Sequence, residues 1–168
     1  MNKSTKTTVQ EIVDFSALAQ KYCDMIEEYE NRPTDEFLKE CAYLLANLFA
    51  ATLTFRDLDA SSPPTYEGST SYDRNTELST HIADKLGSYN RYWEVANPYE
   101  FADPVSMTLG EDLADIYCNL KDGLVIFHGG DSASVKQAAV HWKMLFFHWG
   151  EHIVDALRAI QRTPYINI

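Results

Sequence analysis

The chain has 168 residues, with 25 Asp or Glu against 14 Lys or Arg, which gives a formal net charge of −11. This length suits a single domain, and 45% hydrophobic and 12% aromatic residues suffice for a core, so wholesale disorder is excluded. Nucleic acids and anionic membranes are bound by basic surfaces, so the acidic charge argues against both as partners.

Two helices are predicted in the N-terminal third of the chain. Residues 1–8 form a flexible, polar N-terminus that leads into the capping-box sequence Thr8–Glu11. After it, apolar residues recur at helical spacing: Ile12, Phe15, Ala19, Tyr22, Cys23, Ile26 and Tyr29. The second helix follows Pro33 and carries two adjacent stripes, Phe37, Cys41, Leu44, Leu48, Ala51 and Phe55 in one and Leu38, Ala42, Leu45 and Phe49 in the other. Because a helix that is apolar on two faces is surrounded by others, we expect residues 34–55 to be the central helix.

Two loops flank the third predicted helix. A long polar loop over residues 59–75, rich in Ser, Thr, Pro and Gly, precedes it. The helix itself is predicted from Thr76 to Trp93, with these residues facing inward: Leu78, Ile82, Leu86, Tyr89 and Trp93. An acidic, proline-containing loop over residues 94–108 follows, and a second capping-box sequence, Thr108–Glu111, opens the fourth helix.

The fourth helix ends at Gly129-Gly130, and the last one begins near Ser132 or Ser134. Its apolar stripe continues to Ile160, about eight turns at 3.6 residues per turn, with a kink or a close helix approach expected at Gly150. No segment shows sustained strand alternation, an internal repeat or a second composition. The sequence therefore predicts an all-α fold, a single domain over residues 1–168 built as an antiparallel bundle of about five helices.

One group of residues in the last helix has the spacing of metal ligands. His148 and His152 are one turn apart, and Asp155 lies a turn further along the same side. The fourth helix has three carboxylates available to complete a zinc or iron site, those of Glu111, Asp112 and Asp115. The alternative is that these histidines pack beside the apolar stripe and hydrogen-bond to neighbouring groups. The Glu-x-x-His repeat of di-iron bundles is absent, so no cofactor is expected unless this site binds metal.

The remaining polar and aromatic candidates have ordinary structural explanations. Acidic residues at the start of the fourth helix are stabilised by the helix dipole. Arg158 and Arg162, near the end of the last helix, are stabilised by the opposite end of that helix's dipole. Both arginines would also suit a clamp that binds an anion. Phe147 points away from the apolar stripe, on the side of Val140 and Val154, which suggests a second buried face or an oligomer contact. No hydrolase elbow, phosphate loop, dinucleotide fingerprint or Cys–His cluster is present, so no catalytic residues are predicted.

The cysteines and the absence of targeting signals indicate a cytoplasmic protein. Cys23, Cys41 and Cys118 are odd in number and not at metal spacing, which is typical of reduced thiols. No apolar stretch follows the N-terminus, and the longest apolar run, residues 41–53, is well short of the ~20 residues that cross a bilayer.

Three runs of sequence together resemble a known family. They are Tyr92-Trp93-Glu94 with Asn97-Pro98-Tyr99, then residues 113–117 (Leu-Ala-Asp-Ile-Tyr), then residues 148–152 (His-Trp-Gly-Glu-His) leading into residues 155–160 (Asp-Ala-Leu-Arg-Ala-Ile). In that order they are similar to a bacterial all-helical family called domain of unknown function 5063, over about residues 13–162. The resemblance implies a bacterial, cytoplasmic helical protein and brings no established activity, cofactor or site.

The leading hypothesis is a non-enzymatic interaction or regulatory module that binds a partner protein or forms a homo-oligomer. Residues 94–122 contain seven acidic residues and one lysine, so the negative charge is concentrated in one loop and the helix after it. This acidic segment and the outward apolar residues of the last helix are the expected contact surfaces. The alternative hypothesis is a metal-binding bundle that uses His148, His152 and Asp155.

Overall fold

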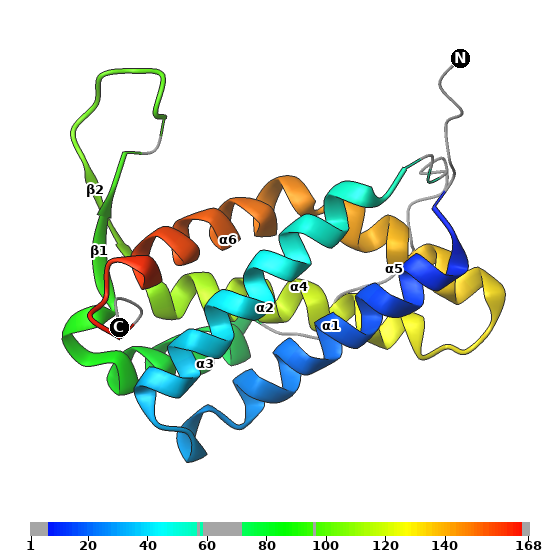
Figure 1. The fold of residues 1–168 in the computed structure, drawn as a ribbon, viewed down its shortest axis with the longest axis horizontal. Coiled ribbons are helices and arrows are strands. Elements are labelled where there is room, and N and C mark those ends of the chain that lie inside the picture. The colour runs from blue at the N-terminus through cyan, green and yellow to red at the C-terminus, as the bar shows by residue number, and fades with distance from the viewer. Residues whose placement is uncertain (1–6, 57, 59–71, 96, 166–168) are drawn as a thin grey trace.

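The computed structural model describes residues 7–56, 58, 72–95 and 97–165, which form a helical bundle with a projecting two-stranded sheet (Figure 1). The α-helices are α1 (Val9–Glu27), α2 (Thr34–Thr54), α3 (Tyr72–Leu86), α4 (Leu109–Phe127), α5 (Ser132–Met144) and α6 (Phe146–Gln161). Strands β1 (Arg91–Glu94) and β2 (Val105–Thr108) pair antiparallel, and the short 3-10 helices are Tyr29–Asn31 and Gly87–Tyr89. The all-α prediction is confirmed, with the small sheet as an addition. Residues 1–6 of the expected flexible N-terminus and residues 59–71 of the expected polar loop lie outside the described residues.

The central helix of the bundle is α4, so the prediction that residues 34–55 hold this place is wrong. Helix α4 packs against α1, α3, α5 and α6, whereas α2 packs mainly on α1 and α6. Two glycines let the neighbours of α4 come close. A Cβ atom at Gly110 would lie 2.5 Å from the carbonyl oxygen of Ser79 in α3, and one at Gly123 would overlap the indole of Trp142 in α5. Neighbouring helices can pack around α4 because these two glycines have no side chain, and not because α4 has a second apolar stripe.

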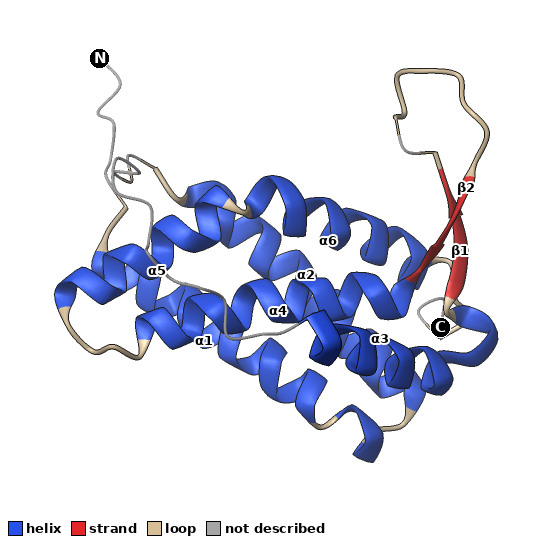
Figure 2. Cartoon of the chain, turned by 180° about the vertical axis from the view of Figure 1, so that it is seen from behind, coloured by secondary structure: helices blue, strands red, loops and turns tan. Residues whose placement is uncertain are grey.

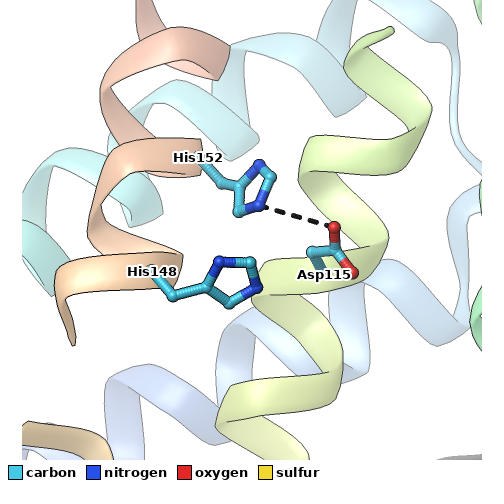
Figure 3. A group of neighbouring side chains, drawn as sticks. All are labelled: Asp115, His148 and His152. Atoms are coloured by element: carbon cyan, nitrogen blue, oxygen red, sulfur yellow. Dashed lines mark ion pairs between the residues drawn. The ribbon is translucent and has the colours of Figure 1, made fainter. Parts of the chain in front are cut away.

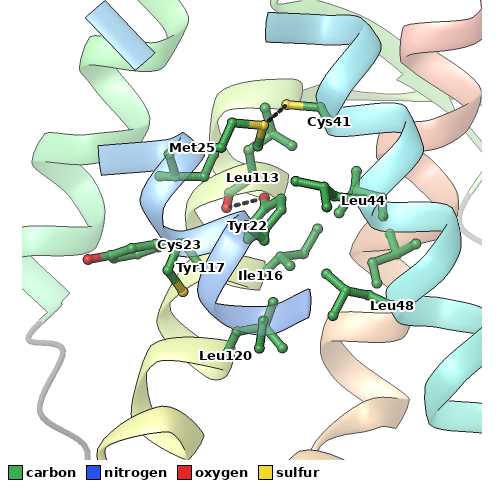
Figure 4. Close-up of a cluster of buried hydrophobic side chains, with 14 of the residues drawn as sticks. Tyr22, Cys23, Met25, Cys41, Leu44, Leu48, Leu113, Ile116, Tyr117 and Leu120 are labelled. Carbon is green, nitrogen blue, oxygen red and sulfur yellow. Dashed lines mark hydrogen bonds between the residues drawn. The ribbon is translucent and has the colours of Figure 1, made fainter. Parts of the chain in front are cut away.

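The core between α1, α2 and α4 is formed by the predicted apolar faces (Figure 4). The buried side chains there are Tyr22, Cys23, Met25, Cys41, Leu44, Leu48, Leu113, Ile116, Tyr117 and Leu120. Tyr22 is fully buried, and its hydroxyl donates a hydrogen bond of 2.9 Å to the carbonyl of Leu113, so its one polar group is satisfied. The predicted capping box at Thr8 and Glu11 is also confirmed, with both reciprocal hydrogen bonds formed.

The predicted last helix is divided at Leu145 into α5 and α6, and the division is not at Gly150. The indole N–H of Trp149 donates to the carbonyl of Trp142 at 3.0 Å, the carbonyl that a continuous helix would pair with the amide of Phe146. Both tryptophans are fully buried, so the chain turns where two large side chains must enter the core together. Gly150 lies inside α6, with the ring of Phe146 packed against it.

The third predicted helix is wrong at both ends. Helix α3 already begins at Tyr72, so residues 72–75 of the expected polar loop are helical. Helix α3 ends at Leu86 because Gly87 adopts a φ of +55°, which other residues rarely take. The chain then enters β1, where Trp93 is 66% exposed instead of facing inward. The expected loop over residues 94–108 therefore contains the last residue of β1 and the whole of β2, and the two strands pair from Arg91 opposite Thr108 to Glu94 opposite Val105.

Asn90 joins the base of this hairpin to α4. Its backbone carbonyl accepts the amide of Leu109, and its side-chain oxygen accepts the amide of Gly110, both at 2.8 Å. Thr108 makes no capping bond to the backbone of α4; its hydroxyl donates to the Glu111 carboxylate at 2.6 Å. The second predicted capping box is thus replaced by Asn90, a residue that only the tertiary fold brings to this helix start.

None of the described helices combines the length and the apolar character that crossing a bilayer requires.

Candidate functional site

Polar side chains from α4 and α6 meet where the two helices pack together. His148 and His152 lie one turn apart on α6 and point toward Asp115 of α4 (Figure 3). One nitrogen from each ring and one carboxylate oxygen all lie within 4.8 Å of one another. Nε2 of His152 and Oδ2 of Asp115 are 3.5 Å apart.

The carboxylate of Asp112 forms the buried end of this group. Its side chain is only 1% exposed, and Oδ1 lies 2.9 Å from Nδ1 of His152. The hydroxyl of Tyr92, on β1, donates to Oδ2 at 2.6 Å. Each oxygen of Asp112 therefore has a partner, which is what a carboxylate needs when it is removed from water.

Asp115 is held from the other side by α3. The side-chain amide of Asn75 donates to Oδ1 of Asp115 at 2.5 Å, while Oδ2 faces His152. A continuous path of polar contacts therefore runs from Tyr92 through Asp112 and His152 to Asp115 and Asn75. It connects the hairpin, α4, α6 and α3, and it borders a surface cavity of about 270 Å³.

The electrostatics of the group favour a positive charge on or beside His152. Burial by itself lowers the pKa of His152, but the hydrogen bond and negative charge of Asp112, together with Asp115 and Asp155, raise that pKa above its usual value. Burial, aided by the hydrogen bond to Asp112, raises the pKa of Tyr92, so its hydroxyl stays protonated and acts as a donor.

Asp155, expected from the sequence to be the third ligand, is not part of the group that surrounds the two imidazoles. It pairs with Glu94 of β1. Arg158 also bonds to Glu94, at 2.7 Å, and to the carbonyl of Trp93, at 2.9 Å. Asp115 takes the place of Asp155 beside His148 and His152. The reason is the position of the neighbouring helix, since α4 brings a carboxylate closer to the rings than their own helix does.

The pair formed by Glu94 and Asp155 makes one prediction about pH. Burial raises the pKa of both carboxyls, and their mutual repulsion adds to the effect at Glu94. A carboxyl whose pKa is higher in the folded than in the unfolded state stabilises the fold at low pH, and this contribution is lost as pH rises through the folded value. Asp155→Asn is therefore expected to raise the melting temperature at neutral pH by about 2 °C.

The difference should vanish below about pH 3, where both carboxyls are protonated in either state. Thermal unfolding followed by circular dichroism across this pH range measures it. Glu151→Gln is the matched control, because Glu151 is an exposed acidic residue on the same helix and its loss changes the net charge equally. A lower melting temperature for Asp155→Asn at neutral pH would contradict the prediction and mean that attraction to Arg158 dominates.

A second feature is the hairpin arm, which we define as residues 91–108. It projects from one end of the bundle, with its connecting loop away from the helices (Figure 2). Tyr99 and Phe101 in this loop are fully exposed, and the acidic residues Glu100 and Asp103 beside them are exposed too. Such neighbouring exposed aromatic residues are uncommon on a monomer surface.

Basic side chains gather at the base of the same arm. A cavity of about 390 Å³ is bordered by Arg91, Arg158 and Arg162, together with the aromatic residues Tyr89 and Trp93. Arg158 is partly neutralised by Glu94, whereas Arg91 reaches the hydroxyl of Ser106. The two arginines that the sequence singled out, Arg158 and Arg162, are thus joined by a third from the hairpin.

The outward apolar residues expected on the last helix are only partly outward. Phe147 is 78% exposed and Val154 is also exposed, but Val140 is buried. Val140 belongs to α5, which the division at Leu145 separates from α6, the helix of Phe147 and Val154. His141 is on α5 as well, beside Asn119 and Asp122 of α4, and does not join His148.

Comparison with known proteins agrees with the sequence resemblance. A family model with the description "Domain of unknown function (DUF5063)" matches residues 6–165. The chain belongs to this family. No curated protein matches it. A solved structure, protein BF1032 from Bacteroides fragilis, resembles this DUF5063 chain with a TM-score of 0.77 and 20% identity over 90% of both chains, so the likeness is one of fold.

Two members of the polar group in this DUF5063 chain had a signal in the sequence. Asp112 lies on the buried face of α4 between Leu109 and Ile116, and an acidic residue at such a position needs a partner. Asp115, one turn on, was a candidate as an available carboxylate. Tyr92 and Asn75 had no such signal, because both come from segments whose place beside α4 depends on the fold.

Proposed function

We propose that this protein is a non-enzymatic interaction module that associates with a second copy of itself through the hairpin arm. The observation that carries the proposal is the full exposure of Tyr99 and Phe101 in the loop of the arm. Aromatic residues supply large contact areas with little loss of side-chain entropy, and they are enriched in protein interfaces.

The charge of the arm supports this choice of partner. Between Tyr92 and Thr108 the sequence has three acidic residues, Glu94, Glu100 and Asp103, and no basic one. A fitting partner surface is an aromatic pocket rimmed by basic side chains. The cavity at the base of the arm, with Arg91, Arg158 and Arg162 beside Tyr89 and Trp93, has this character.

The two surfaces also suit a symmetric pair. If two arms lie antiparallel about a two-fold axis, the loop of each arm reaches the base of the other. The same contact is then made twice, as in a closed dimer, and no further surface is left to continue the assembly.

The first test is the mass of the protein in solution. Light scattering coupled to gel filtration is expected to show a dimer whose fraction grows with concentration, and Tyr99→Ser with Phe101→Ser should convert it to a monomer. Tyr43→Ser is the matched control, since Tyr43 is an exposed aromatic residue on α2, away from the arm. Phe147→Ser tests the exposed face of α6. If this change alone dissociates the dimer, the interface lies on α6 and not on the hairpin arm.

A charge exchange tests the reciprocal arrangement. Glu100→Arg should weaken the dimer, and so should Arg162→Glu. When the two variant proteins are mixed, one contact pairs the two changed residues and the other pairs the two original ones, so a mixed dimer is expected to form. A protein that stays monomeric at high concentration, or a mixture that does not dimerise, would contradict the proposal.

We further propose that the protein acts in the cytoplasm. The three cysteines support this location: Cys23 and Cys41 are buried, Cys118 is partly buried, and none of them is joined in a disulfide within the described part of the chain. Cell fractionation with a compartment-specific thiol label tests it, and oxidised cysteines in the isolated protein would contradict it.

A further inference from the structure

The group formed by Asp115, His148 and His152 has the geometry of a metal site. In a tetrahedral zinc site with bonds of about 2.0–2.1 Å, neighbouring ligand atoms are about 3.3 Å apart. The Nε2 atom of His152 and the Oδ2 atom of Asp115 are separated by 3.5 Å, close to this value. His148 adds a third ligand atom within 4.8 Å of the other two, a distance that a side-chain rotation can close.

The hydrogen bonds around the group orient these ligand atoms. A carboxylate only accepts hydrogen bonds, so a neutral His152 donates its Nδ1–H to Asp112, at 2.9 Å, and turns the lone pair of Nε2 toward Asp115. Asn75 occupies the other oxygen of Asp115. Metal-binding histidines commonly donate their second nitrogen to a buried carboxylate in this way, and ligating carboxylates are themselves hydrogen-bonded.

This orientation leaves two electron-rich atoms facing each other. The lone pair of Nε2 and the Oδ2 oxygen repel unless a positive species lies between them. A proton on Nε2 is one such species, but 3.5 Å exceeds the usual N–H···O distance of about 2.7–3.2 Å. A cation bound by both atoms satisfies the same charge requirement at the separation observed.

We propose that Asp115, His148 and His152 bind a divalent first-row transition metal, with zinc as the first ion to test. Two imidazoles and one carboxylate suit Zn²⁺, Fe²⁺ or Mn²⁺ better than Ca²⁺ or Mg²⁺, which prefer oxygen ligands alone. Three protein ligands leave at least one position for water or a small ligand. The cavity of about 270 Å³ beside Asp115 and His152 gives that position access to solvent. This site is independent of the hairpin arm and of self-association.

The test uses full-length protein that is made without a histidine tag and treated with a chelator. Calorimetric titration with zinc chloride is expected to give one ion per chain, and cobalt chloride should give the visible absorption of tetrahedral Co²⁺. His148→Ala should weaken zinc binding at least tenfold and abolish the cobalt spectrum. Because His148 is exposed, this variant is expected to fold normally.

Two further variants distinguish a metal site from the alternative, an ion pair between a protonated His152 and the neighbouring carboxylates. Asp112→Asn should weaken zinc binding about 10- to 100-fold, because it removes the acceptor that orients His152 without removing a ligand. Asp155→Asn, which removes the carboxylate that spacing alone had favoured, should leave zinc affinity unchanged. Binding that is weaker than millimolar, or that His148→Ala does not alter, would overturn the proposal and leave a protonated His152 held between two carboxylates.

Discussion

Gly123→Ala is expected to lower the free energy of unfolding by about 3 kcal/mol, at the upper end of what overpacking a core costs. A Cβ atom at this position would lie 1.9 Å from Nε1 of Trp142 and 2.4 Å from Cε2, well inside contact distance. The indole cannot move aside easily, because Trp142 is fully buried and its Nε1–H donates to the carbonyl of Leu120 at 3.2 Å. Alanine is ordinarily the better helix residue by about 1 kcal/mol, so the predicted direction opposes helix propensity.

Urea unfolding measures this change, and the melting temperature should fall by about 6–12 °C. A double-mutant cycle with Trp142→Leu provides the control. If the clash with the indole is the cause, Gly123→Ala in the Trp142→Leu background should lower the free energy of unfolding much less, or even raise it. An equal cost in both backgrounds would show that the close approach of α5 to α4 is not what requires glycine here.

Asp112→Ala is expected to lower the free energy of unfolding by a similar amount, about 3 kcal/mol. The substitution leaves the Tyr92 hydroxyl and Nδ1 of His152 without the acceptor they now share. It also removes the negative charge closest to a partly buried imidazole. Tyr92→Phe removes only one donor and should cost about 1 kcal/mol, so the two variants together separate the hydrogen bond from the charge.

The pKa of His152 provides a second measurement for the Asp112 variant, by NMR titration of metal-free protein. In the native protein Asp112 and Asp115 lie beside this ring, and their negative charges, with a smaller contribution from Asp155, raise the pKa of His152 despite burial. Without Asp112, less negative charge opposes the effect of burial, so the pKa of His152 should fall. Because the native pKa is raised, the ion pair with Asp112 stabilises the fold most below about pH 6.5 and contributes less as pH rises through the raised value. The stability difference between native and Asp112→Ala protein should shrink over that interval, and a constant difference would contradict this account.

The helices were predictable because each carries a local, repeating apolar signal. Most buried residues of α1 and α2 were predicted, including Tyr22 and Leu48, and the capping box at Thr8 marked where α1 begins. Such signals depend on residues three or four positions apart, so they survive without any knowledge of the neighbouring helix. The same reasoning failed at Leu145, because the apolar stripe continues across the break and the competing hydrogen bond comes from the indole of Trp149.

The candidate site was half predictable for a related reason. His148 and His152 share a side of one helix, so their spacing was visible in the sequence. The sequence offered both Asp155 and Asp115 as carboxylate partners but could not decide between them, because Asp155 lies nearer in sequence whereas Asp115 lies nearer in space. Asp112, the residue that orients His152, is 40 positions away from it in the chain.

The sequence by itself determined the all-α class, the family, the main apolar faces and the concentration of acidic residues near the hairpin. Each of these follows from local composition and from short-range periodicity. The tertiary structure decided that α4 is central, that residues 91–108 form a projecting arm, and that Asp115 and not Asp155 faces the histidines. These outcomes depend on how closely elements distant in the chain approach one another, which is governed by residues such as Gly123 and Trp142 acting together.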